Sequence, residues 1–225
     1  MVIVARSKHQ IYFFVSCFLE YILTPINLMN QLLNKNLFLV KEHIGMFKAA
    51  NNFDIFDPTT SEHIFNCRED NLGGFTKFFR FTKYKVMTPL DVQINTVSNE
   101  PILGIKRGFS FFGFKPLNVL DENGAIIGTL NRQFRIGGAK VEINDKSGKH
   151  VYTLKGNLIG WDFKIYKNDQ IVAEITKKWA GLGKELFTSA DNYILSIKDG
   201  VEPNDPGRIL MLAAVLCIDF LLKEN

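Results

Sequence analysis

The chain has 225 residues, of which 46 % are hydrophobic and 22 % charged, and its formal net charge is +4 at pH 7. This composition excludes a disordered chain and is typical of a globular protein with a sizeable core. The three cysteines are odd in number and far apart, and the four histidines form no pair at helical spacing, so neither a disulfide framework nor a zinc site is predicted. The mild positive charge is compatible with an anionic membrane face or a nucleic acid and selects neither.

Residues 1–33 differ from the rest of the chain. A basic start is followed by an apolar run, Ile11–Leu19. This run is too short to span a bilayer, and no small-residue cleavage site follows it. We therefore expect residues 1–33 to be an N-terminal extension or a membrane-surface segment, outside a single domain of residues 34–225. In the alternative interpretation Met29 is the natural start of the protein.

From Leu37 the chain repeats one unit, in which an alternating strand runs into a polar turn and a second strand returns. The turns are rich in Asp, Asn and Gly, which tolerate positive φ or bond their own backbone, and period-2 alternation gives each strand one buried face. The expected strand pairs are 53–56 with 64–67, 92–94 with 102–105, 117–120 with 126–130, 141–143 with 151–154, and 163–166 with 171–175. Strands at 37–40 and 193–197 bring the total to about twelve, which favours a closed antiparallel barrel. The alternative is an ordinary β-sandwich with a C-terminal helix packed against it.

The apolar stretch Pro206–Leu222 predicts a C-terminal helix without a polar face. Such a helix must be surrounded by protein or by lipid. A membrane span needs roughly 20 apolar residues, whereas this run is broken by an aspartate, so we favour a helix inside the barrel and keep the span as the alternative. Side chains already fill a barrel of about eight strands, so a wider one needs a central element. The central-helix residues are expected to be Ile209, Leu210, Leu212, Val215, Leu216, Ile218 and Asp219.

A specific motif lies between the last two strands. Its positions are Trp179, Gly181, Glu185, Phe187, Thr188, Ala190, Asp191, Asn192 and Tyr193. This pattern resembles that of the phospholipid scramblase family, and a looser similarity extends over residues 37–222. The related LURP-one-like proteins and the tubby C-terminal domain share the fold. The resemblance implies a mainly β, tubby-like closed antiparallel barrel of about twelve strands around a central C-terminal helix.

The chain departs from the animal scramblases in several ways. It has neither their cysteine cluster for palmitoylation nor their Pro-rich N-terminal region. Their proposed calcium segment begins with Asp, and Ser189 stands there in this chain. Asp191, Asn192 and Asp199 therefore remain as a weak calcium candidate, because calcium takes about 6–8 oxygen ligands with several carboxylates. The alternative for Asp191 and Asn192 is turn capping, and no other cofactor is expected.

No catalytic motif is complete in the sequence. The stretch 181–184 does not form a Walker loop, because Glu185 follows Lys184 where Ser or Thr is required. There is also no Gly-x-Ser-x-Gly nucleophile elbow. We therefore expect no enzymatic activity beyond, at most, the translocation of lipids.

Two stretches, 75–85 and 106–115, interleave basic and aromatic residues. Basic residues attract anionic lipid, and aromatic side chains favour the membrane interface. The same interleaving suits single-stranded nucleic acid, and a plainer interpretation is a barrel wall with Phe inward and Lys or Arg in water. Phe109–Phe114 is the exception, since it is aromatic on both faces and part of it is expected to be exposed. The lipid-binding candidates are Arg80, Lys83, Lys85, Lys106, Arg107, Lys115, Phe111 and Phe112.

Together these features predict a cytoplasmic protein, peripheral at the inner face of a membrane. The family resemblance implies ATP-independent, bidirectional movement of phospholipids, or phospholipid binding, at an anionic membrane surface. The first alternative is a non-catalytic module of the LURP-one or tubby-like type that binds lipid or a protein partner. The second and weaker alternative is nucleic-acid binding through the basic and aromatic stretches.

Overall fold

The structure is a computed structural model. It describes residues 31–43, 49–70, 72–82, 84, 87–110, 115–133, 138–157, 160–177 and 192–222, with the backbone alone at 219–222. The chain divides into two compact units, Met1–Lys35 and Asn36–Asn225. The strands and the two helices considered below all belong to the second unit. The predicted N-terminal extension lies almost wholly outside the described residues and stays a prediction.

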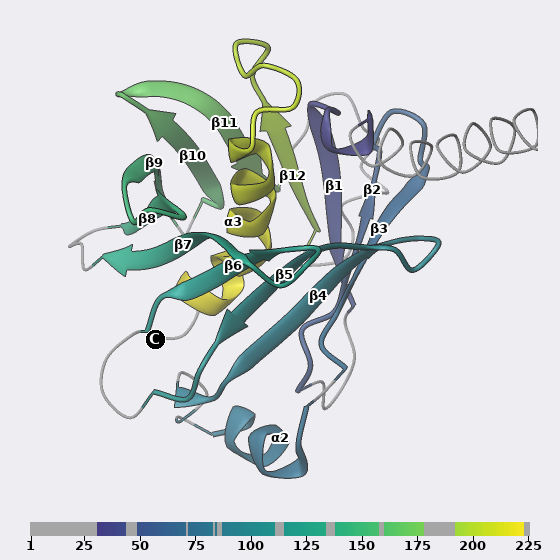
Figure 1. Ribbon diagram of the computed structural model, residues 1–225, viewed down its shortest axis with the longest axis vertical. Coiled ribbons are helices and arrows are strands. Elements are labelled where there is room, and N and C mark those ends of the chain that lie inside the picture. Colours follow the sequence, from purple (N-terminus) through teal and green to yellow (C-terminus); the bar gives the residue numbers. More distant parts are fainter. Residues whose placement is uncertain are drawn as a thin grey trace, which may run out of the picture. The chain divides into compact units, whose positions relative to one another are not determined.

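Twelve antiparallel strands in the described part of the chain form a closed barrel (Figure 1). Neighbours in sequence are neighbours in the wall, and β1 closes the barrel by pairing with β12, with Phe38 opposite Leu195. The strands are β1 (Leu37–Glu42), β2 (Phe53–Phe56), β3 (His63–Arg68), β4 (Leu90–Thr96), β5 (Pro101–Arg107), β6 (Leu117–Asp121), β7 (Ile126–Gln133), β8 (Ala139–Asp145), β9 (His150–Asn157), β10 (Asp162–Lys167), β11 (Gln170–Thr176) and β12 (Asn192–Ile197). The predicted barrel is confirmed, and the sandwich alternative is wrong because closure leaves no separate second sheet.

The hairpin turns form where the sequence predicted them, and aspartates hold them. In the β6–β7 turn, Asp121 accepts hydrogen bonds from the backbone N–H groups of Asn123 and Ala125, at 3.0 and 2.8 Å. Gly124 in that turn has φ of +80°, a conformation that costs glycine little. The β8–β9 turn repeats this arrangement with Asp145. These local bonds hold the turns that connect successive strands.

The C-terminal helix α3 (Gly207–Leu222) lies inside the barrel (Figure 1). Every side chain from Leu210 to Ile218 is buried, and Ile209 is half-buried. The helix contacts β7, β8 and β12. A Cβ atom added at Gly128 would lie 2.6 Å from the backbone oxygen of Asn144 and 2.7 Å from a methyl carbon of Leu210, so the neighbouring strand and the helix together leave no room for a larger residue. The predicted central helix is confirmed, although the side chain of Asp219 lies outside the described set.

Arg208 anchors the first turn of α3 to the barrel. Its guanidinium donates to the carbonyl oxygen of Val201 at 3.0 Å and to the side-chain oxygen of Asn36 at 2.7 Å. The amide of Asn36 donates in turn to the carboxylate of Asp199 at 2.9 Å. These bonds join the turn after β12, the residue before β1 and the start of the helix. Asp199 therefore has a structural role at the place where the barrel closes.

Within the described residues, no helix combines the length and the apolarity that crossing a bilayer requires.

Candidate functional site

The segment between β3 and β4 forms a short helix, α2 (Gly74–Arg80), at one end of the barrel (Figure 1). The sequence interpretation that placed the aromatic residues of this segment in a barrel wall, with Phe pointing inward, is wrong. Phe75 and Phe78 are three residues apart and therefore lie on one face of a helix. The helix is not part of the sheet, so that face has no second layer to cover it.

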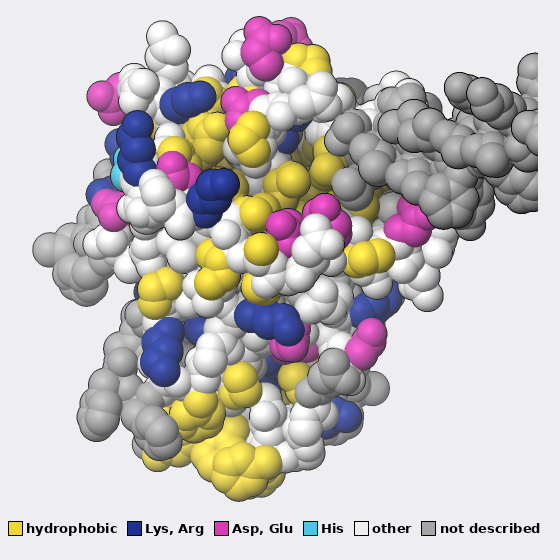
Figure 2. Space-filling model, in the orientation of Figure 1, with side chains coloured by type: hydrophobic (Ala, Val, Ile, Leu, Met, Phe, Trp, Pro, Cys, Tyr) yellow, Lys and Arg dark blue, Asp and Glu magenta, His cyan; other side chains and the backbone are white. Residues whose placement is uncertain are grey.

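Aromatic side chains around α2 are exposed. The exposed fractions are 74 % for Phe75, 67 % for Phe78, 58 % for Phe81, 41 % for Tyr84 and 38 % for Phe109. We call these five residues the aromatic surface. Figure 2 shows hydrophobic side chains gathered at this end of the molecule, over α2. Exposed apolar patches of this kind mark interaction sites in folded proteins.

Ring contacts hold the aromatic surface together. The ring of Phe79 lies 4.6 Å from that of Phe75, 5.7 Å from that of Phe78 and 6.1 Å from that of Tyr84, measured between centroids. The loop that carries Phe109 joins the same region, because the N–H of Ser110 donates to the carbonyl oxygen of Met87 at 3.1 Å. Phe79 thus supports a cluster whose outer members face solvent.

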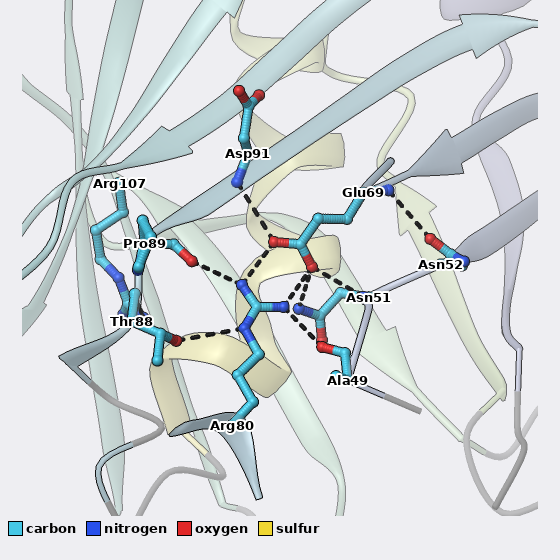
Figure 3. A network of polar contacts seen from close by, with 9 residues as sticks. All are labelled: Ala49, Asn51, Asn52, Glu69, Arg80, Thr88, Pro89, Asp91 and Arg107. Atoms are coloured by element: carbon cyan, nitrogen blue, oxygen red, sulfur yellow. Dashed lines mark hydrogen bonds and ion pairs between the residues drawn. The ribbon is translucent and has the colours of Figure 1, made fainter. Parts of the chain in front are cut away.

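The opposite face of α2 is fixed by a buried ion pair between Arg80 and Glu69 (Figure 3). Their side chains are only 3 % and 2 % exposed. One guanidinium nitrogen donates to Glu69 at 2.6 Å and to the carbonyl oxygen of Pro89 at 2.7 Å. The other terminal nitrogen donates to Glu69 and to the carbonyl oxygen of Ala49, and Nε donates to the hydroxyl of Thr88. All five N–H groups of the guanidinium therefore have an acceptor.

The carboxylate of Glu69 also has hydrogen-bond partners beyond Arg80. It accepts hydrogen bonds from the backbone and the side chain of Asn51, at 3.0 and 2.8 Å, and from the backbone N–H of Asp91. A buried ion pair persists only where such additional bonds replace the lost water. The pair fastens α2 to the residues before β2 and at the start of β4, and this fixes which face of the helix turns outward.

Two lipid-binding candidates are corrected by this geometry. Arg80 is buried against Glu69, so it is a positioning residue and does not face a headgroup. Arg107 is also buried, and it donates to the carbonyl oxygen of Thr88 at 3.2 Å. Both were predicted to meet lipid because they alternate with aromatic residues, but each guanidinium donates instead to backbone oxygens below the aromatic surface.

The exposed cations near this end are lysines. Lys77 on α2 and Lys115 before β6 are exposed. Lys106 is also exposed and forms an ion pair with Asp91 at 3.1 Å. The remaining candidates, Lys83, Lys85, Phe111 and Phe112, lie outside the described residues.

The structure does not bring the residues of the weak calcium candidate together. Asn192 is the first residue of β12 and is buried, whereas Asp199 follows the other end of that strand. A strand advances about 3.3 Å per residue, so the two side chains are too far apart to share one ion. The motif residues before Asn192 all lie outside the described set: Trp179, Gly181, Glu185, Phe187, Thr188, Ala190 and Asp191. In the described ranges no group of three or more His, Cys, Asp or Glu side chains is arranged to hold a metal.

Sequence reasoning missed two features of this site. Phe75, Phe78 and Phe81 recur at a spacing of three, which is typical of a helix, and this signal could have shown that they lie on one face. Glu69 gave no such signal, because its partner is 11 residues away and only the folded barrel brings the two together.

Comparisons with known proteins identify the family. The family model named Scramblase matches residues 15–225. The chain belongs to the scramblase family. The resemblance drawn from the motif around Trp179 is therefore confirmed.

Individual relatives are distant or partial. Altered inheritance rate of mitochondria protein 25 of Saccharomyces cerevisiae is 22 % identical over 212 residues, which cover 77 % of this chain and 64 % of the relative. Phospholipid scramblase 1 of Mus musculus is 31 % identical over 67 residues, which cover 30 % of this chain and 20 % of the relative. The chain therefore spans less than two thirds of the length of these curated relatives.

A solved structure shares the architecture. The X-ray structure of a protein from Arabidopsis thaliana superposes with a TM-score of 0.50 and 13 % sequence identity, covering 84 % of this chain and 94 % of that one. At this identity the likeness shows the fold alone.

Proposed function

We propose that this scramblase-family chain binds phospholipid membranes through the aromatic surface at the α2 end of its barrel. The observation that carries the proposal is a set of exposed aromatic rings on a helix whose other face is held by the buried Arg80–Glu69 pair. Aromatic side chains favour the interface between water and hydrocarbon. The burial of α3 within the barrel supports α2, not α3, as the element that meets lipid.

The lysines supply the electrostatic part of the proposal. Lys77 and Lys115 are exposed cations near the rings, and each basic residue close to an anionic surface contributes ~1 kcal/mol. Burying a Phe side chain in an apolar environment contributes ~1.5–3 kcal/mol. Lysine attraction brings the barrel to the membrane, and the rings then hold it there. Binding of this kind is peripheral, and we assign it to an anionic leaflet such as the inner face of a cell membrane.

Sedimentation of the protein with vesicles tests the proposal. The variant Phe75→Ser, Phe78→Ser, Phe81→Ser is expected to bind anionic vesicles at least about tenfold more weakly, because a tenfold change needs only ~1.4 kcal/mol. The matched control replaces three other exposed apolar residues, Val97→Ser, Ile126→Ser and Ile171→Ser. Val97 lies after β4, at the end of that strand away from α2. Equal binding by the two triple variants would overturn the proposal.

The salt dependence of binding separates the electrostatic contribution of the lysines from the apolar contribution of the rings. At about 1 M salt the screening length falls to about 3 Å, from about 8 Å under physiological conditions. Raising salt is therefore expected to weaken the initial capture on anionic vesicles. Binding that is insensitive to both salt and lipid charge would contradict the role given to the lysines.

We further propose that membrane-bound protein carries out ATP-independent, bidirectional phospholipid movement. Family membership supports this finer activity. The assay is dithionite reduction of fluorescent lipid in proteoliposomes without ATP. The native chain is expected to expose the protected leaflet, and the Phe75, Phe78, Phe81 variant is expected to lose that activity together with binding. Lipid binding without any leaflet exchange would leave the chain a lipid-binding module of the same fold.

A further inference from the structure

Three lysines face one another across the outer wall of the barrel. Lys155 on β9 is the register partner of Lys140 on β8 and also of Lys164 on β10. These three strands are neighbours in the wall (Figure 1). Like charges directly opposite one another destabilise a sheet, so the row works against the stability of the fold.

Neighbouring carboxylates do not neutralise the centre of this row. Glu142 pairs with Lys140 at 2.9 Å. Glu174 is the register partner of Lys164 but forms its ion pair with Lys198, at 3.2 Å. Among the described residues, Lys155 and Lys164 have no ion-pair partner. Two adjacent positive charges therefore remain open to a ligand.

The two lysines line a hollow of about 380 Å³ on the barrel surface. Tyr166 lies in the same lining, and the ammonium of Lys155 is 4.9 Å from the centre of its ring. This cation–π contact limits the positions that the Lys155 ammonium adopts. Asp162 forms part of the lining and is exposed. The volume is within the range of small-ligand sites, about 300–1,000 Å³.

We propose that this lysine hollow binds the phosphate group of a phosphorylated ligand, either a lipid headgroup or a soluble phosphate ester. Lys155 and Lys164 donate to the phosphate oxygens, and the ligand replaces the missing counter-charge of the row. The carboxylate of Asp162 repels a second anionic group on its side and accepts hydrogen bonds from hydroxyls. The site therefore favours a single phosphate attached to a hydroxyl-bearing group. This inference uses no residue of the aromatic surface and is independent of the proposed membrane contact.

The test compares two double variants of equal charge. Lys155→Gln, Lys164→Gln empties the hollow of cations, whereas the matched control Lys41→Gln, Lys106→Gln removes two lysines of β1 and β5 that lie outside its lining. Binding of inorganic phosphate and of glycerol 3-phosphate is followed by calorimetry, with melting temperatures recorded to verify folding. The hollow variant is expected to bind glycerol 3-phosphate at least about tenfold more weakly than the native chain, and the control is expected to keep native affinity. Equal losses in both variants, or no loss in either, would overturn the proposal.

A vesicle arm separates the two sources of phosphate. Vesicles with phosphatidate are compared with vesicles of the same surface charge made with phosphatidylglycerol. Stronger binding to phosphatidate that the hollow variant loses assigns the site to a lipid headgroup, and binding in the soluble arm alone assigns it to a soluble ester. The proposal would be overturned if the native protein bound neither inorganic phosphate nor glycerol 3-phosphate and bound the two kinds of vesicle equally. The Phe75, Phe78, Phe81 variant should keep glycerol 3-phosphate binding, so failure of one proposal is distinguishable from failure of the other.

Discussion

Arg80 is the single residue whose role changes most between the sequence and the structure. A cation in an aromatic stretch matches the pattern of a lipid-facing residue, but its guanidinium lies in a closed network of acceptors (Figure 3). The pattern around Arg80 is local, whereas its partner Glu69 belongs to a different element. Sequence spacing alone therefore predicted the wrong type of contact for this residue.

Replacing Arg80 tests its positioning role. Arg80→Met leaves the Glu69 carboxylate buried without a counter-charge, so the free energy of unfolding is expected to fall by ~3–5 kcal/mol. Chemical denaturation measures this value. The matched control is Lys106→Met, which breaks an exposed pair with Asp91 and is expected to cost only ~0–1 kcal/mol. A loss for Arg80→Met no larger than for Lys106→Met would show that the network does not hold α2.

Asp54 makes part of the fold's stability dependent on pH. Burial raises the pKa of this carboxyl, but hydrogen bonds from Arg68 and His43, at 2.6 and 2.7 Å, outweigh burial and lower it. A group with a depressed folded-state pKa contributes stability above its ordinary value, about 3.9, and loses it as pH falls through the folded value. The native chain is therefore expected to lose more stability between neutral pH and about pH 3 than Asp54→Asn does. Unfolding curves at both pH values check this, and parallel losses would contradict the role of Asp54.

At the scale of elements, the two helices present their apolar residues differently: those of α3 are buried inside the barrel, and those of α2 are exposed on its surface. The run from Ile209 to Ile218 was readable from sequence because a helix with no polar face needs complete enclosure. The strands were readable because alternation and Asp-rich turns act over a few residues. The helix α2 was missed although Phe75, Phe78 and Phe81 recur at helical spacing, because seven residues are too few to form a stable helix in isolation and contacts such as the Arg80 network hold this one in the folded chain.

The interior helix gives a direct stability prediction. Leu212→Asp places an unpaired charge where the native side chain is 1 % exposed, and is expected to cost several kcal/mol out of a total of ~5–15. Thermal melting measures the effect. Ile126→Asp, at an exposed position, is the control and should leave the melting temperature nearly unchanged. A soluble Leu212→Asp protein with native melting temperature would mean that α3 is not the core.

At the scale of the whole molecule, three parts of the barrel have different roles. Its interior encloses α3, one end carries the aromatic surface, and the outer wall of β8 to β10 carries the lysine hollow. Closure and strand order followed from the number of alternating segments and from the family motif. The aromatic surface depends on which rings the folded chain leaves exposed, and the lysine hollow depends on the strand register that sets Lys155 beside Lys164. Sequence spacing does not contain that information.

Membrane contact through α2 can be measured as the depth at which a tryptophan placed on that helix enters the bilayer. Phe78→Trp is bound to anionic vesicles that contain brominated lipids, and Val97→Trp, at the far end of β4, is the matched control. Both are read as differences from the native chain, whose Trp161 and Trp179 are common to all three proteins. If α2 enters the membrane, the tryptophan at position 78 is strongly quenched and the tryptophan at position 97 is quenched little. Equal quenching at both positions, or none at 78 while the protein is bound, would contradict membrane contact through α2.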